Sequence, residues 1–176
     1  MADKKTLWNN AGRAGIILGG IPIIYTMCTF LLSKIEGAAV LTGLGNVVLW
    51  AAKFVLCIWL MNVFMKQWYK SNEGMSRGEL FKYGTIVALL SAIVYSAFYL
   101  AYIQFIVPDV LDQALETMQD MPQMDSNTSQ MMESLLPKLP TITFFFNLGY
   151  CWLFGTILSS IFSSRIVSDN PFKEEQ

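Results

Sequence analysis

The chain has 176 residues, of which 54% are hydrophobic and only 14% are charged, and its net charge is −1. Ordinary soluble domains contain about 25% charged residues, so this composition indicates a single membrane domain. The near-neutral charge argues against a nucleic-acid partner, which would need a basic face. The chain contains no histidine, and it therefore lacks the commonest general base and the commonest zinc ligand.

Four long stretches of the chain carry almost no charge. They comprise 20 residues, 29 residues with Lys53 as the only charge, and two runs of 26 residues. About 20 apolar residues cross the hydrocarbon core of a bilayer, and such segments are helical because lipid offers their backbone no outside partner. We therefore predict an all-α protein, one domain over residues 1–176, with four transmembrane helices at Ala14–Leu32, Val47–Met65, Tyr83–Val107 and Ile142–Ser163.

The first span follows a short basic segment, as in a secretory signal. No A-x-A-like cleavage site follows it, so we expect a permanent span, with a kink at Pro22. Small residues recur at every fourth position in this span and in two others. Such ridges let helix backbones approach closely, either within the bundle or in a dimer. The ridges are Ala11, Gly15 and Gly19; Gly84, Ala88, Ala92 and Ser96; and Gly155, Ser159 and Ser163.

Lys53 is the one charged residue inside a predicted span. A charge at this depth is costly and often marks a functional site, such as a counter-ion for a substrate. Trp50 lies one turn away, where the long lysine stem can also carry the ammonium toward the headgroups. Both interpretations, a lipid-facing lysine and a polar group inside the bundle, follow from the sequence.

Three amides accompany this lysine in or near the spans, at Asn62, Gln104 and Asn147. Hydrogen bonds between helices are the ordinary use of such groups. Together with Lys53 they form a candidate polar membrane site, provided that the four side chains converge on one cavity.

The distribution of Lys and Arg predicts the orientation. Nine lie in the N-terminal segment, the loop after the second span and the C-terminal tail, whereas only Lys34 and Lys138 lie on the opposite side. Cytoplasmic loops carry the excess of positive charge, so we expect both termini in the cytoplasm of a multi-pass inner-membrane protein. Aromatic residues of this side, including Trp68 and Tyr83, are expected among the headgroups.

Residues 109–138 form the predicted extracytoplasmic segment, an acidic, Met-rich helical hairpin. Pro108 ends or kinks the third span, Pro122 opens the turn, and Pro137 ends the second helix. Five of the ten methionines fall here, and they suggest either a packing face or, less simply, a Cu(I) site. We predict a surface for a partner or for lipid at Leu111, Leu115, Met118, Met121, Met131 and Met132.

The sequence contains no pattern of a catalytic, cofactor-binding or metal site. Cys28, Cys57 and Cys151 lie in apolar segments, where a thiol behaves as a small hydrophobic group. We therefore expect no enzyme, no cofactor and no metal.

The chain resembles, over nearly its whole length, a family of small bacterial four-span inner-membrane proteins known only as a domain of unknown function. The resemblance rests on Gly19 and Pro22 in the first span, on the segments 66–70 and 81–84, and on the segment 102–109 at the end of the third span. It implies no activity, cofactor or catalytic residue. It does imply a link to a lipid-linked glycosyltransferase, and thus a helper role in envelope glycan or lipid handling.

Two functional hypotheses remain. In the first, the protein is a structural or partner subunit of an envelope-associated complex, with membrane lipid and either a second copy or another membrane protein as partner. In the second, it is a small transporter or a component of a lipid or glycolipid flippase, which would use the four polar residues of the candidate membrane site.

Overall fold

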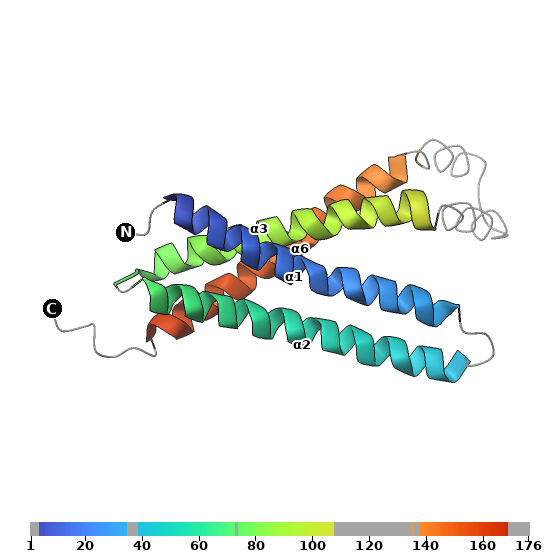
Figure 1. The fold of residues 1–176 in the computed structure, drawn as a ribbon, viewed down its shortest axis with the longest axis horizontal. Coiled ribbons are helices and arrows are strands. Elements are labelled where there is room, and N and C mark those ends of the chain that lie inside the picture. Colours follow the sequence, from blue (N-terminus) through green and yellow to red (C-terminus); the bar gives the residue numbers. More distant parts are fainter. Residues whose placement is uncertain (1–3, 35–38, 73, 108–134, 136–137, 169–176) are drawn as a thin grey trace, which may run out of the picture.

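The computed structural model describes residues 4–34, 39–72, 74–107, 135 and 138–168. Regular structure in these residues is entirely helical, which confirms the all-α prediction. Pro22 lies inside the first helix, which remains unbroken across it. The long helices are α1 (Lys4–Ser33), α2 (Ala39–Ser71), α3 (Arg77–Ala101) and α6 (Leu139–Ser168), and a short π-helix, η1 (Tyr102–Ile106), continues α3 (Figure 1).

The four long helices are long and apolar enough to cross a membrane, as the sequence predicted. Each extends beyond the predicted span at one or both ends. With 30 residues and a rise of about 1.5 Å per residue, α1 is about 45 Å long, whereas the hydrocarbon core is about 30 Å thick. The charged ends of the helices therefore reach the headgroups and the water beyond them.

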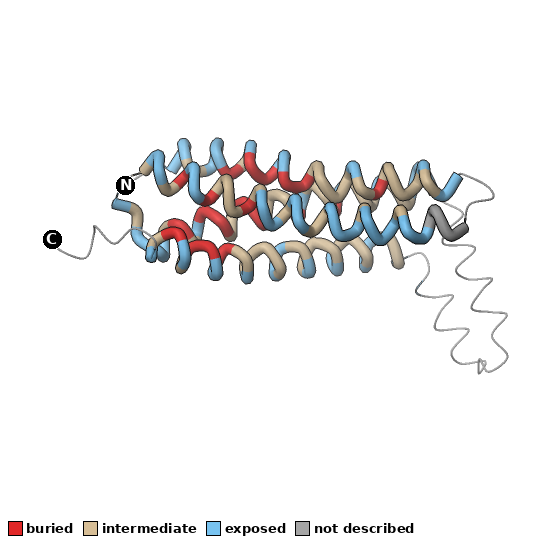
Figure 2. The backbone as a smooth tube through the Cα atoms, turned by 90° about the horizontal axis from the view of Figure 1, so that it is seen from below, coloured by how far each residue is buried: buried red, intermediate tan, exposed pale blue. Residues whose placement is uncertain are grey.

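The helices form two antiparallel pairs, α1 with α2 and α3 with α6. Figure 1 shows that these pairs lie close together at the end that holds Lys4 and Ser168 and diverge toward the other end. α3 is the central helix, because it packs extensively on both α1 and α6, whereas α2 packs mainly on α1. Most of the fully buried residues lie in the half where the pairs meet (Figure 2).

Tyr83 holds three helices together in this half. Its side chain is fully buried, its hydroxyl donates a hydrogen bond to Asn10 Oδ1 at 2.7 Å, and its ring stacks on Trp68 with centroids 4.8 Å apart. Trp68 and Tyr83, which we expected among the headgroups, thus pack on each other inside the bundle, near the end of α2 and the start of α3, and their depth in a membrane stays a prediction. An amphipathic ring suits the interface, but here both rings turn inward because each offers the other a stacking partner.

The turn between α2 and α3 brings these two rings together. Ser76 caps α3, with its hydroxyl accepting from the Glu79 N–H, and the Glu79 carboxylate accepts from the Ser76 N–H at 2.9 Å. Gly74 before the cap has a φ of 85°, a conformation that glycine adopts without steric strain. The reciprocal cap fixes where α3 begins and thus the register of Tyr83 against α2.

The ridges of small residues form contacts within the chain. A Cβ atom on Gly15 would lie 2.7 Å from Leu90 Cβ, and one on Gly155 would lie 2.5 Å from Ala88 Cβ. A Cβ on Gly84 would meet the Ser159 side chain, whose hydroxyl donates to the Phe81 carbonyl at 3.0 Å. Of the two alternatives, the structure thus shows the internal use of the ridges.

The predicted hairpin at 109–138 lies outside the described residues, apart from Leu135 and Lys138. The same holds for its proposed partner surface, Leu111, Leu115, Met118, Met121, Met131 and Met132.

Gly15 and Gly12 offer a matched test of the close packing of α1 on α3. Replacing Gly15 with Leu should lower the free energy of unfolding by about 1–3 kcal/mol, because the new side chain would overlap Leu90 and the α3 backbone. Gly12→Leu on the same helix should have little effect, since nothing lies within 4 Å of the added Cβ. Unfolding by sodium dodecyl sulfate in mixed micelles measures both. Equal stabilities would contradict the internal role of the ridge.

Candidate functional site

A cavity of about 230 Å³ lies between the helix pairs, and all four long helices contribute to its wall. We call it the central cavity. Apolar groups such as Leu18, Met61 and Leu158 form much of its lining. Seven side chains that carry a polar group also line it: Lys53 and Cys57 from α2, Ser91 and Tyr95 from α3, and Asn147, Tyr150 and Cys151 from α6.

Lys53 reaches the central cavity from the middle of α2. It precedes Lys66, which follows the predicted second span, by 13 positions, and this corresponds to about 20 Å along a helix. Its ammonium nitrogen lies 4.3 Å from the ring centroid of Tyr25 on α1 and 5.0 Å from that of Phe54. Both aromatic faces attract the cation.

The position of Lys53 supports one of the two interpretations of this residue. The side chain is half-buried and points at α1 and at the cavity, which agrees with a polar group inside the bundle. The four apolar stretches contain no Asp or Glu that could neutralise it. Two aromatic rings stabilise an ammonium without cancelling its charge, so the site keeps a positive potential.

Only Asn147 among the three predicted amides shares this cavity with Lys53. Asn62 is half-buried on α2 and does not line the cavity, because its position next to Met61 turns it to another side of the helix. Gln104 lies in η1 with its side chain exposed. The structure therefore brings together two members of the candidate polar membrane site, Lys53 and Asn147, from two different helices.

The other polar lining groups were not identified from the sequence. Ser91 and Tyr95, like Lys53 and Cys57 or Asn147 and Cys151, stand four residues apart on one helix. Residues at this spacing share a helix face. A search for polar pairs one turn apart within the spans would therefore have found these three pairs, one on each helix. Cys57 and Cys151, which we interpreted as hydrophobic filler, are free thiols on the cavity wall.

Aromatic residues frame the cavity on the side of α2 and α6. The Phe54 and Phe154 rings meet edge to face, with centroids 5.9 Å apart, and Trp50 packs on Phe54 at 4.7 Å. Tyr150 lines the cavity while 54% of its surface is exposed, so the cavity also reaches the outer surface of the bundle. In the membrane this surface faces lipid.

In chemical terms, the site offers one cation, one amide and several hydroxyl and thiol groups inside an apolar wall. An ammonium attracts an anion, and an amide both donates and accepts hydrogen bonds. The described residues include no cluster of three or more His, Cys, Asp or Glu side chains that could hold a metal ion.

An unneutralised lysine in a membrane cavity should lower the stability of the protein without ligand. We expect Lys53→Met to raise the free energy of unfolding by about 0.5–2 kcal/mol, because functional sites are commonly kept at the expense of stability. Lys66→Met, at the exposed end of the same helix, should give no such gain. The measurement is again unfolding in mixed micelles. A clear loss of stability in Lys53→Met would show instead that the lysine is mainly a structural contact to Tyr25 and Phe54.

Comparison with known proteins gives a family but no function. No curated protein and no solved structure matches the chain. The model of one family, described as protein of unknown function (DUF4199), matches residues 13–165, a range that contains every residue of the central cavity. The chain therefore belongs to the DUF4199 family.

Proposed function

We propose that this protein is a non-enzymatic subunit of an envelope-associated membrane complex, and that it binds an anionic lipid or glycolipid in its central cavity. The observation that carries the proposal is the position of Lys53, an intramembrane cation on the wall of a cavity that all four helices line. If the protein holds such a ligand or passes it on, it would be a component of a small transporter or flippase.

The electrostatics of the site favour an anionic ligand. Placing a lysine at the centre of a membrane helix costs about 2.5–3.5 kcal/mol. A phosphate or carboxylate beside the ammonium would offset this cost, since charges attract more strongly in a medium of low dielectric constant than in water. Asn147 could bind a neighbouring ester, hydroxyl or amide group of the same ligand.

The surroundings of the site favour a ligand that enters from the bilayer. The cavity is lined by four helices that are long and apolar enough to cross a membrane, and the exposed Tyr150 lies on the outer surface of the bundle, where lipid would be. An amphiphile can reach this site with its chain still in an apolar medium, whereas a soluble anion would have to lose its hydration shell. The family resemblance implies a link to a lipid-linked glycosyltransferase, and this link points to the same class of ligand.

The predicted hairpin at 109–138 is the proposed contact with the rest of the complex. Its residues lie outside the described part of the chain, but the neighbouring end of the bundle supports the proposal. Phe105 in η1 is 80% exposed, and Phe145 and Phe146 at the same end of α6 are 63% and 72% exposed. Such an apolar rim suits contact with a membrane-protein partner or a second copy.

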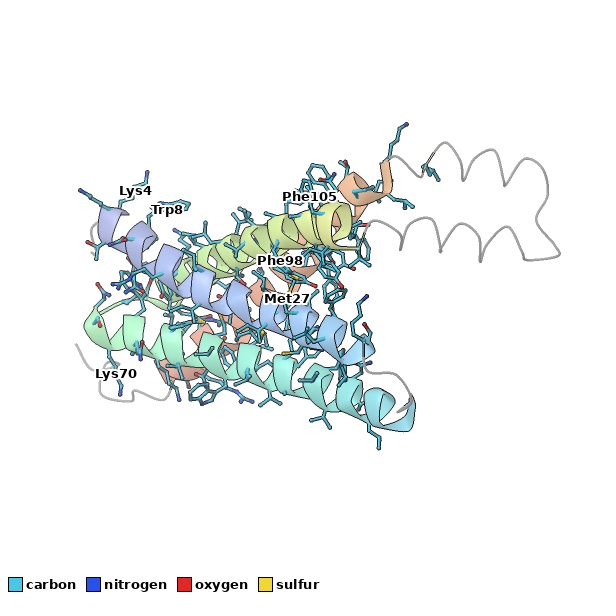
Figure 3. All side chains as sticks on the ribbon, turned by 45° about the vertical axis from the view of Figure 1, so that its right-hand side comes forward. Lys4, Trp8, Met27, Lys70, Phe98 and Phe105 are labelled. Atoms are coloured by element: carbon cyan, nitrogen blue, oxygen red, sulfur yellow. The ribbon has the colours of Figure 1, made fainter. Side chains whose placement is uncertain are left out.

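We further propose that both termini lie in the cytoplasm of a bacterial inner membrane. Lys4, Trp8 and Lys70 lie at one end of the bundle and Phe105 at the other (Figure 3). The first of these ends also holds the basic loop between α2 and α3, which supports a cytoplasmic location under the positive-inside rule.

Reporter tags test this orientation. A short tag inserted after Ser126 should react with a membrane-impermeant reagent in intact cells. Tags at Met1 and at Gln176 should react only after permeabilisation. Equal labelling of all three tags in intact cells would refute the proposed topology.

The cavity cysteines can report ligand binding directly. In phosphatidylcholine nanodiscs, dodecyl phosphate should slow the reaction of Cys57 and Cys151 with N-ethylmaleimide, because its head would fill the cavity that both thiols line. Peptide mass spectrometry follows each cysteine separately. In Lys53→Met, half-protection should require about tenfold more dodecyl phosphate, which corresponds to the loss of about 1.4 kcal/mol of binding free energy.

Two controls separate specific binding from general effects of charge and chain. Lys66→Met removes a cation outside the cavity and should leave the protection almost unchanged. Dodecanol, which carries the same chain and no charge, should protect poorly in the unmodified protein. If Lys53→Met is protected as well as the unmodified protein, Lys53 is not the counter-ion and the proposed function is wrong.

A further inference from the structure

A second cavity, of about 140 Å³, lies along the seam between α1 and α2. We call it the lateral cavity. Aliphatic side chains from both helices form most of its wall, and the remaining lining residues are Tyr25, Cys28, Ala52 and Lys53. Ile24 and Leu56 in this wall are 65% and 46% exposed, so the lateral cavity opens on the surface of the bundle that faces lipid.

Lys53 lines both cavities. On α1, Leu18 and Pro22 face the central cavity, whereas Ile21 and Cys28 face the lateral one. The two cavities therefore lie on opposite sides of the α1–α2 seam and meet at this lysine. The Tyr25 ring, 4.3 Å from the lysine nitrogen, belongs to the wall of the lateral cavity.

We propose that the two cavities form one bipartite site for an amphiphile with a single anionic head and a hydrocarbon chain. The head lies beside Lys53 and Asn147 in the central cavity, and the chain passes through the α1–α2 seam into the lateral cavity and on to the bilayer. The inference rests on the proposed function and adds where the chain of the bound ligand lies.

The charge and polarity of the two cavities determine which one holds the head of the ligand and which one holds its chain. The positive charge lies at the junction of the cavities, and the amide and most hydroxyl groups lie on the central side. The head therefore belongs in the central cavity. The lateral cavity offers mostly aliphatic contacts and opens to lipid, which suits a chain and disfavours a charged group.

The position of the lateral cavity, rather than looser packing of the helices, puts the chain at the α1–α2 seam. On the α2–α6 side, the rings of Phe54 and Phe154 touch edge to face across the gap. On the α1–α2 side, the Lys53 ammonium meets the Tyr25 ring, and Ala52 beside it presents only a methyl group to the lateral cavity. A narrow opening between two helices is suited to one chain rather than two.

A photoactivatable dodecyl phosphate with a diazirine in its chain tests the path of the chain. In phosphatidylcholine nanodiscs, irradiation should attach the probe mainly to the lateral wall, in residues 21–28 and 49–56. An uncharged analogue with an alcohol head should label these segments several-fold less. Lys53→Met should reduce the labelling by dodecyl phosphate to the level of the analogue.

Ala52 and Ala51 provide the matched variants. Ala52→Phe would fill the lateral cavity and should abolish labelling of these segments, whereas Ala51→Phe, exposed and outside both cavities, should not. The protection of Cys57 and Cys151 from N-ethylmaleimide by butyl phosphate, whose chain is too short to extend far beyond the seam, should survive in Ala52→Phe.

The outcomes separate this inference from the proposed function. Charge-dependent protection of both cysteines with the probe attached at Tyr150 or Phe154 would keep the proposed function and overturn the bipartite site. The same holds if Ala52→Phe is labelled like Ala51→Phe. Cysteine protection that is independent of Lys53 would refute both proposals.

Discussion

The close approach of α1 and α6 to α3 is the constraint on which the rest of the structure depends. Small residues on the facing ridges of α3 and α6 let these backbones touch, as where Gly84 meets Ser159, and Gly15 of the α1 ridge lies against Leu90 and the backbone of α3. Between lipid-facing helices there is no hydrophobic driving force, so such contacts and a few hydrogen bonds supply most of the attraction. At the same end, the Tyr83 hydroxyl donates a hydrogen bond to Asn10, and the Tyr83 ring stacks on Trp68, which holds α2 against the other helices.

The divergence of the helix pairs follows from this one-sided packing. Helices that touch at one end and cross at an angle separate toward the other, and the space between them must be filled by larger side chains or left open. Here the filling is incomplete, and the central cavity lies at the depth where the α2 lysine projects. Packing at one end therefore creates a site between the four helices that no single helix could form.

The spans, their number and the ridges of small residues could be predicted because they depend on local composition and on a spacing of four residues, whereas the choice between internal and dimer contacts needed the structure. The inward turn of Trp68 and Tyr83 could not, since an aromatic residue near a helix end suits both the headgroups and a stacking partner on the next helix. The Ser76–Glu79 cap was visible in the sequence as a spacing of three residues, and it would have indicated the start of α3.

The candidate site was predictable only in part, because helical periodicity fixes the face of each helix but not the rotation of one helix against another. Lys53 and Asn147 were chosen for their chemistry and do share a cavity, whereas Asn62 and Gln104 have similar chemistry and lie elsewhere. Each of the first two has a thiol one turn away within the predicted span, Cys57 and Cys151, whereas the polar residue one turn from Asn62 is Lys66 near the end of α2. A lone amide in a span can form its hydrogen bonds with any polar neighbour, but two polar groups one turn apart on the same face need a common environment. This difference separates a cavity wall from an isolated interhelical contact.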